Sequence, residues 1–171
     1  MLRVTWRHRP RASRARPDAR ASRLFLSGLV FVIDSNVASE LMRPVPTEAV
    51  EAWIGEHDAE DMYLTAVNEA ELLYGVAIMP SGKRRKTLEA AMNRLLGHGF
   101  RGRILPFDSA AARVYAEIAT KRRNAGRPIA EADCQIAAIA RAHGAVLVTR
   151  NVRDFEGTGL VVIDPWSFGP S

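Results

Sequence analysis

Length, composition and charge limit what this chain can be. It has 171 residues, 47% of them hydrophobic and 25% charged, which allows one buried core and excludes a wholly disordered protein. Residues 1–23 hold eight arginines and one aspartate; taking these from the totals of 24 and 19 leaves 16 basic and 18 acidic residues. The net charge of +5 is therefore no argument that the folded part binds nucleic acid. The single cysteine, Cys134, excludes an internal disulfide, fits a reducing cytoplasm and is interpreted as a small core residue.

The first 29 residues differ from the remainder. Arginine and proline without an apolar period predict that residues 1–29 are a disordered extension, and that residues 30–171 form one domain. The apolar run Leu24–Ile33 follows the basic stretch as in a secretory signal peptide, but no small-residue cleavage site follows it. It is also too short to span a bilayer. We predict a cytoplasmic protein without membrane contact, whose functional start lies near Val30.

Short apolar runs alternate with helical patterns along the rest of the chain. Strands are predicted at 30–33, 62–65, 103–106, 145–149 and 160–163, and helices at 36–42, 48–57, 66–79, 83–96, 110–124 and 130–143. Thr47 and Asp108 are predicted N-caps. Such alternation is typical of α/β proteins. We predict a three-layer α/β/α sandwich with a central, mostly parallel sheet.

A run of four basic residues, Lys83 to Lys86, begins the helix at 83–96. Such a run is most often a solvated helix start and less often a nucleic-acid contact. The sequence leaves both interpretations open.

Acidic and amide residues follow two predicted strands. Asp34 follows the strand at 30–33, while Asn151 and Asp154 follow the strand at 145–149. In open parallel sheets, ligands bind beyond the carboxyl ends of the strands, so these side chains are candidate site residues. Each also has a plain structural interpretation, Asp34 as a helix N-cap and the other two as turn residues.

Asp133 gives a stronger signal. On the helix at 130–143 it shares a face with Ile136, Ala137 and Ala140. A carboxylate on an apolar face needs a cation, hydrogen-bond donors or a metal ion, because its burial is costly. We therefore favour a functional role for Asp133.

The helix at 66–79 is apolar nearly all round and carries two acids, Glu69 and Glu71. They lie about 200° apart on the helix, so one is expected to face a site and the other solvent. Geometry alone does not choose between them.

The type of residue in this set indicates the chemistry. The four histidines have no metal-ligand spacing, and no glycine-rich phosphate loop is present. Several acids from different elements, without histidine or cysteine, favour a hard cation such as Mg²⁺ or Mn²⁺. The matching reaction is phosphodiester hydrolysis.

Four segments carry a family resemblance across the predicted domain. They are Val32–Val37, Glu71–Gly75, Ile129–Ala138 and Thr149–Phe155, followed by Pro165-Trp166. Their order and spacing resemble those of PIN-domain ribonucleases, specifically the VapC-type toxins of bacterial toxin–antitoxin pairs. Each segment is weak alone, and the four together are a strong signal. The arginine-rich N-terminal stretch has no counterpart in the family.

The resemblance implies a PIN-like fold and a set of site residues. Asp34, Glu71 and Asp133 would be the catalytic acids, which selects Glu71 over Glu69, and Asp34 and Asp133 would be the main Mg²⁺ ligands. Relatives often carry a fourth aspartate where this chain has Asn151. Either Asn151, through its carbonyl oxygen, or Asp154 is then a second-tier ligand.

The resemblance also implies partners: RNA, often tRNA, as substrate, a homodimer, and a small DNA-binding antitoxin that inserts into the active site. We predict an Mg²⁺-dependent endoribonuclease, a hydrolase that acts as a toxin and in which Mn²⁺ can replace Mg²⁺. A phosphotransferase of the haloacid-dehalogenase type would need an aspartate at Asn36. A catalytically silent binding module with the same fold is the other alternative, and the presence of both Asp34 and Asp133 argues against it.

Overall fold

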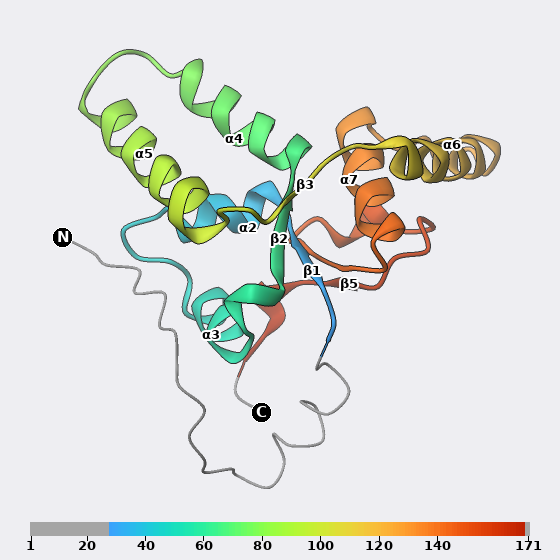
Figure 1. The fold of residues 1–171 in the computed structure, drawn as a ribbon, viewed down its shortest axis with the longest axis horizontal. Helices are drawn as coiled ribbons and strands as arrows, with labels where there is room; N and C mark the ends of the chain where they lie inside the picture. Colours follow the sequence, from blue (N-terminus) through green and yellow to red (C-terminus); the bar gives the residue numbers. More distant parts are fainter. Residues whose placement is uncertain (1–27, 170–171) are drawn as a thin grey trace, which may run out of the picture.

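Five short strands form one sheet in the order β3-β2-β1-β4-β5 (Figure 1). They are β1 (Phe31–Ile33), β2 (Met62–Thr65), β3 (Ile104–Leu105), β4 (Val146–Val148) and β5 (Val162–Ile163). The structure, a computed structural model, describes residues 28–169, and every strand pairing within them is parallel. The predicted parallel sheet is confirmed. The predicted extension, residues 1–29, lies almost wholly outside the described residues.

Helices cover both faces of this sheet. They are α2 (Ser35–Leu41), α3 (Glu48–Glu56), α4 (Ala66–Ala77), α5 (Lys83–Arg94), α6 (Ser109–Asn124) and α7 (Glu131–Ala142). Along β1, Phe31 and Ile33 pack into a core with α2, α3, α4 and α5, whereas Val32 between them packs with α6 and α7. Figure 1 shows α4 and α5 on one side of the strands and α6 and α7 on the other. The predicted three-layer sandwich is confirmed.

Short helical turns complete the chain. They are the 3₁₀ turns η1 (Ala59–Asp61), η3 (Val152–Phe155) and η4 (Pro165–Ser167), and the π-helical turn η2 (Leu95–Gly99). The predicted helix at 83–96 thus remains α-helical only to Arg94. Cys134 is buried, as predicted.

The two predicted N-caps differ in what their side chains bind. The Asp108 side chain accepts a hydrogen bond from the Ala111 amide at 2.9 Å, so this prediction is confirmed. Thr47 is the N-cap of α3, as predicted, but its side chain makes no capping hydrogen bond. Its hydroxyl donates instead to the carboxylate of Glu40 at 2.7 Å. Because Glu40 is buried, its carboxylate needs donors, and it takes the hydroxyl of Thr47 for that purpose.

Helix α4 leaves much of its apolar surface uncovered. Leu72 and Val76 are buried, whereas Leu73 is 44%, Tyr74 67% and Ile78, just after the helix, 62% exposed. We call Leu73, Tyr74 and Ile78 the α4 apolar face. No helix in the described range 28–169 is both long and apolar enough to cross a membrane.

Candidate active site

The candidate site lies where the strand order reverses. β1 pairs with β2 on one side and with β4 on the other, and ligands bind in open α/β sheets at the carboxyl ends of such strands. Asp34 directly follows β1, and its backbone amide donates to the Val148 carbonyl of β4 at 2.9 Å. Thr149 directly follows β4 and is fully buried. The sheet therefore brings these two side chains together.

Asp34 accepts four hydrogen bonds, two on each carboxylate oxygen. Oδ1 accepts from the Ser35 amide at 2.8 Å and from Asn68 Nδ2 at 3.1 Å. Oδ2 accepts from Asn36 Nδ2 at 2.8 Å and from Thr149 Oγ1 at 2.6 Å. The Ser35 bond makes Asp34 the N-cap of α2, so the structural interpretation is confirmed, and the same side chain faces the site. Burial raises the pKa of Asp34, and the four hydrogen bonds act in the opposite direction.

Asn68 connects Asp34 with the start of α4. Its amide nitrogen donates to Asp34 and to Ser35 Oγ, the latter at 3.0 Å. Its oxygen accepts from the amide and the hydroxyl of Thr65, which caps α4. The Ser35 hydroxyl in turn donates to Oε2 of Glu71, which lies one turn after Asn68 on α4. This chain of contacts fixes α4 relative to β1 and aims Glu71 at the same space as Asp34.

Asp133 differs from Asp34 in its surroundings. It lies in the first turn of α7 and is half-buried, while Ile136, Ala137 and Ala140 on its face of the helix are buried. Within residues 28–169 its carboxylate makes neither a hydrogen bond nor an ion pair. Desolvation, followed by the negative charges of Asp34, Asp154 and Glu71, raises the pKa of Asp133 to about 6.

The structure brings four of the five predicted residues into one cleft. Asp34, Glu71, Asp133 and Asn151 line a space of about 470 Å³. Asp154 is exposed on η3 and does not line it, although its charge acts on Asp133. A larger hollow of about 860 Å³, on α5, contains none of these acids, so we assign the chemistry to the smaller cleft.

Sequence reasoning missed the side chains that hold Asp34. Asn68 and Thr149 are fully buried polar residues, yet neither stood out in the sequence. The available signal for both was position, since Thr149 follows a buried strand and Asn68 is the third residue of a helix. Polar residues are common at both positions, so position alone did not distinguish them.

The oxygen-rich cleft suits Mg²⁺. Carboxylates and amide oxygens are the ligands of hard cations. The Asp133 carboxylate accepts no hydrogen bond within residues 28–169, and it lies near three other acids. In the described part of the chain, no three Asp, Glu, His or Cys side chains stand grouped to hold one metal ion. Mg²⁺ does not need such a group, since it usually binds through one or two carboxylates and keeps several waters.

Comparison with known proteins agrees with the fold. The family model described as PIN domain matches residues 31–159. The chain belongs to the PIN domain family. The match includes Asp34, Glu71, Asp133 and Asn151, so every predicted residue of the cleft lies inside the PIN domain.

Two curated relatives of this PIN domain match it over nearly their whole length. The VapC ribonuclease Y4jK of Sinorhizobium fredii is 44% identical over 140 residues, which is 80% of this chain and 98% of the relative. The toxin FitB of Neisseria gonorrhoeae is 39% identical over 137 residues, which is 80% of this chain and 99% of the relative.

Solved structures of toxin–antitoxin complexes share the fold. FitAB bound to an IR36 DNA fragment matches with a TM-score of 0.76 at 38% identity, over 82% of this chain and 99% of that one. VapBC2 from Rickettsia felis, bound to a promoter DNA fragment, matches with a TM-score of 0.67 at 22% identity, over 79% of this chain and 98% of that one. The second likeness supports the fold alone.

Proposed function

We propose that this PIN domain is an Mg²⁺-dependent endoribonuclease and the toxin of a toxin–antitoxin pair. The observation that carries the proposal is Asp133, a half-buried carboxylate without a donor among the described residues. Three negative charges surround it, and a divalent cation offsets this repulsion better than any side chain in the cleft. The names of the relatives, a VapC ribonuclease and the toxin FitB, supply RNA as the substrate class and toxicity as the role.

Asp34 and Asp133 are the proposed metal ligands, with Asn151 or Asp154 as a further oxygen ligand. A divalent cation held there supplies positive charge for the phosphate and lowers the pKa of a bound water. The four donors around Asp34 keep its carboxylate in one orientation, which preorganises the site. Glu71, held by Ser35 at the cleft, accepts the proton of the attacking water. Mn²⁺ fits the same oxygen ligands.

The proposed partners are an RNA substrate, a second copy of the chain and a small antitoxin. The solved relatives are complexes of a toxin with its antitoxin, bound to DNA. The α4 apolar face offers uncovered surface beside the cleft, because Tyr74 belongs to both. A cytoplasmic location remains a prediction from the sequence.

Cleavage of RNA by the purified chain tests this proposal. Wild-type protein is incubated with total RNA in Mg²⁺ and in EDTA, beside the variants Asp34→Asn, Asp133→Asn and Glu51→Gln. Glu51 is an exposed acid on α3, so its variant controls for the loss of one negative charge. We expect the wild type and Glu51→Gln to cleave RNA in Mg²⁺. The rate of cleavage should be at least about 100-fold lower in EDTA and in the Asp34→Asn and Asp133→Asn variants.

Two results would contradict the proposal. Equal cleavage in Mg²⁺ and EDTA would exclude the metal-dependent mechanism. Absence of cleavage by the antitoxin-free wild type, with RNA binding intact, would favour the alternative of a catalytically silent binding module.

A further inference from the structure

The acids of the cleft create a problem for binding RNA. Asp34, Glu71 and Asp133 line the cleft, and RNA is a polyanion. The rest of the folded part does not compensate, because residues 24–171 hold 16 basic and 18 acidic residues. Affinity for RNA comes mainly from phosphate contacts with lysine and arginine, so a locally basic surface must lie beside the cleft.

One exposed group of basic side chains has no partner in the described part of the chain. Lys83, Arg84 and Lys86, in the first turns of α5, are exposed and take part in none of the ion pairs within residues 28–169. We call these three residues the α5 basic surface. Arg85 is excluded from it, because its guanidinium donates to the Met79 carbonyl at 3.2 Å and closes the loop between α4 and α5.

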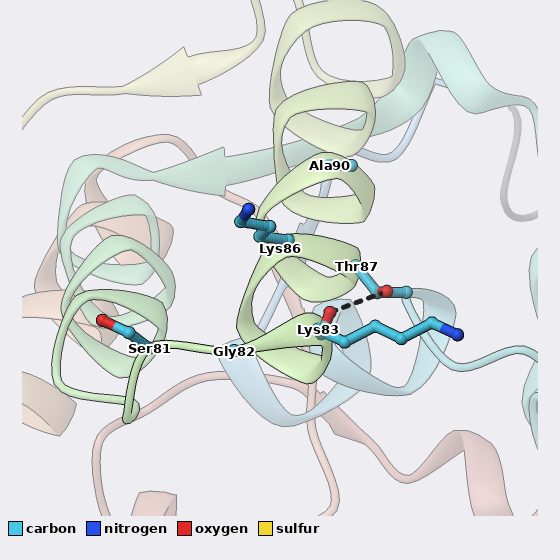
Figure 2. Close-up of a pocket in the computed structure, with 6 residues that line it drawn as sticks. All are labelled: Ser81, Gly82, Lys83, Lys86, Thr87 and Ala90. Carbon is cyan, nitrogen blue, oxygen red and sulfur yellow. Dashed lines mark hydrogen bonds between the residues drawn. The ribbon is translucent and has the colours of Figure 1, made fainter.

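The α5 basic surface borders a hollow of about 860 Å³, which Lys83 and Lys86 line together with Ser81 and Thr87. Figure 2 shows the two lysine side chains extending from the helix in different directions, while the Thr87 hydroxyl bonds to the Lys83 carbonyl at 3.0 Å. Both ammonium groups therefore face solvent and are available to an anion.

Helix α5 also reaches the cleft. Leu88, one turn further along α5, lines the cleft together with the acids. Arg84 lies four residues before Leu88 and so shares its side of the helix. From Lys83 to Leu88 the helix rises about 7.5 Å, at 1.5 Å per residue. Lys83 and Lys86 lie about 140° and 160° around the helix from Leu88, at about 100° per residue, so RNA that leaves the cleft past Arg84 reaches them by crossing the first turns of α5.

The geometry points to the α5 basic surface as a binding site for backbone phosphates of RNA that extends out of the cleft across the start of α5. This inference rests on the proposed function, since it takes RNA as the substrate. The exposed bases of α6 are less well placed. Lys121 and Arg123 are equally exposed, but they lie on α6, across the sheet from α5, and no residue of α6 lines the cleft (Figure 1).

Binding of a labelled single-stranded oligoribonucleotide, followed by fluorescence anisotropy in EDTA over a range of salt concentrations, tests the inference. The double variant Lys83→Gln/Lys86→Gln is compared with the matched control Lys121→Gln/Arg123→Gln, which removes the same charge elsewhere. We expect the α5 variant to bind about tenfold more weakly, with a salt slope smaller by about 1.4, or 0.7 per lost contact. Adding Arg84→Gln should reduce the slope by about 0.7 more.

A second measurement separates binding from catalysis. Hydrolysis of a small chromogenic phosphodiester, too short to reach the α5 basic surface, should be unchanged in the α5 variants, and circular dichroism should show intact helices. The control double variant should bind RNA within about twofold of the wild type.

Three results would overturn the inference. Equal weakening by both double variants would indicate net charge rather than a site, and no weakening would exclude the surface. Competition by polyglutamate as strong as by RNA of equal charge would indicate an acidic protein partner. The proposed function fails separately: a wild type that binds RNA through α5 yet does not cleave it would contradict only that proposal.

Discussion

Two carboxylates of the same cleft have opposite surroundings. Asp34 accepts four hydrogen bonds, so its orientation is fixed before any ligand arrives. Asp133 has no donor within residues 28–169, and the charges around it oppose its ionisation. Repulsion between Asp133 and the neighbouring acids, which no hydrogen-bond donor to Asp133 offsets, is unfavourable electrostatic energy in the metal-free protein. We expect binding of the proposed cation at Asp133 to release that energy.

This difference predicts that Asp133→Asn stabilises the metal-free protein in a pH-dependent way. The pKa of Asp133 is raised from 3.8 to about 6 in the folded state, so ionisation costs folding free energy as the pH rises through this range. Each pKa unit corresponds to about 1.4 kcal/mol, which solvent screening reduces. We expect Asp133→Asn to raise the free energy of unfolding by about 1–2 kcal/mol at pH 8 and by almost nothing at pH 4.

Urea unfolding in EDTA at the two pH values measures this effect. Glu51→Gln serves as the control for the loss of one exposed charge. Mg²⁺ should reverse the order of stability at pH 8, because only the wild type keeps the ligand. An equal stabilisation at pH 4 and pH 8 would contradict the electrostatic explanation.

At the scale of single residues, the sequence predicts the acids of the cleft and misses the side chains that donate hydrogen bonds to Asp34. Asp133 could be found because its helical neighbours are apolar, which makes a carboxylate there conspicuous. Glu71 could be chosen over Glu69 only through family resemblance. Asn68 and Thr149 could not be found, because their role exists only after β1, β4 and α4 are brought together. Local patterns do not encode hydrogen bonds between residues more than 30 positions apart.

At the scale of elements, α6 and α7 hold the loop that follows β4. Arg122 of α6 is buried and donates to the Glu156 carbonyl, while Arg141 of α7 donates to the Thr158 carbonyl at 3.3 Å. Arg127, just after α6, forms an ion pair with the Glu156 side chain at 2.8 Å. This loop includes Asn151 and Asp154, so three arginines hold the segment that carries the proposed fourth ligand relative to Asp133 on α7.

Arg122 is the residue of this group to test, because its burial is only partly compensated. Its Nε atom is buried and has no hydrogen-bond partner among the described residues. Replacing a poorly satisfied buried charge by an apolar side chain of similar volume is often neutral for stability. We expect Arg122→Met to leave the free energy of unfolding within about 1 kcal/mol of the wild type. Amide exchange at residues 151–158 should rise about tenfold, because the loop loses an anchor.

Mn²⁺ binding, measured by calorimetry, gives the functional readout for Arg122→Met. An affinity about tenfold lower is expected if the loop supplies a ligand or positions one. Arg123→Met, an exposed neighbour on the same helix, is the control and should change neither measurement. Faster exchange with unchanged Mn²⁺ affinity would exclude Asn151 and Asp154 as metal ligands.

Element order and type are the part of the fold that sequence predicts well. The periodicity of apolar residues is a local property, so each strand and helix appears near its predicted position. Thr47 also takes its predicted place as the N-cap of α3, but its hydroxyl donates to Glu40, a buried acid seven residues earlier, and does not cap the helix. The strand order also lies beyond local patterns, since it depends on which strands pair across the sheet.

At the scale of the whole molecule, the α4 apolar face is the surface that most needs a partner. Leu73, Tyr74 and Ile78 expose apolar side chains on neighbouring turns, and contiguous apolar patches usually mark interaction sites. Tyr74 also lines the cleft, so a protein bound to this face lies at the entrance for RNA. The proposed antitoxin is therefore the partner that we expect on this surface.

This placement predicts that Leu73→Lys/Ile78→Lys weakens binding of the proposed antitoxin by at least about 30-fold, or about 2 kcal/mol for the loss of central apolar contacts. Neither residue lines the cleft, so the free variant should cleave RNA within about twofold of the wild type. Titration of the antitoxin against cleavage measures both quantities. Val161→Lys, at an exposed valine beside β5, is the matched control and should be inhibited normally.

Light scattering on the chain alone distinguishes the antitoxin from a second copy of the chain. If the α4 apolar face binds the antitoxin, the double variant keeps the molar mass of the wild type and escapes inhibition. If the variant changes from dimer to monomer while inhibition persists, the face belongs to the homodimer and the prediction is wrong. The two outcomes differ because a dimer contact on α4 would cover Tyr74 in the free toxin, whereas an antitoxin contact leaves it open for RNA until the inhibitor binds.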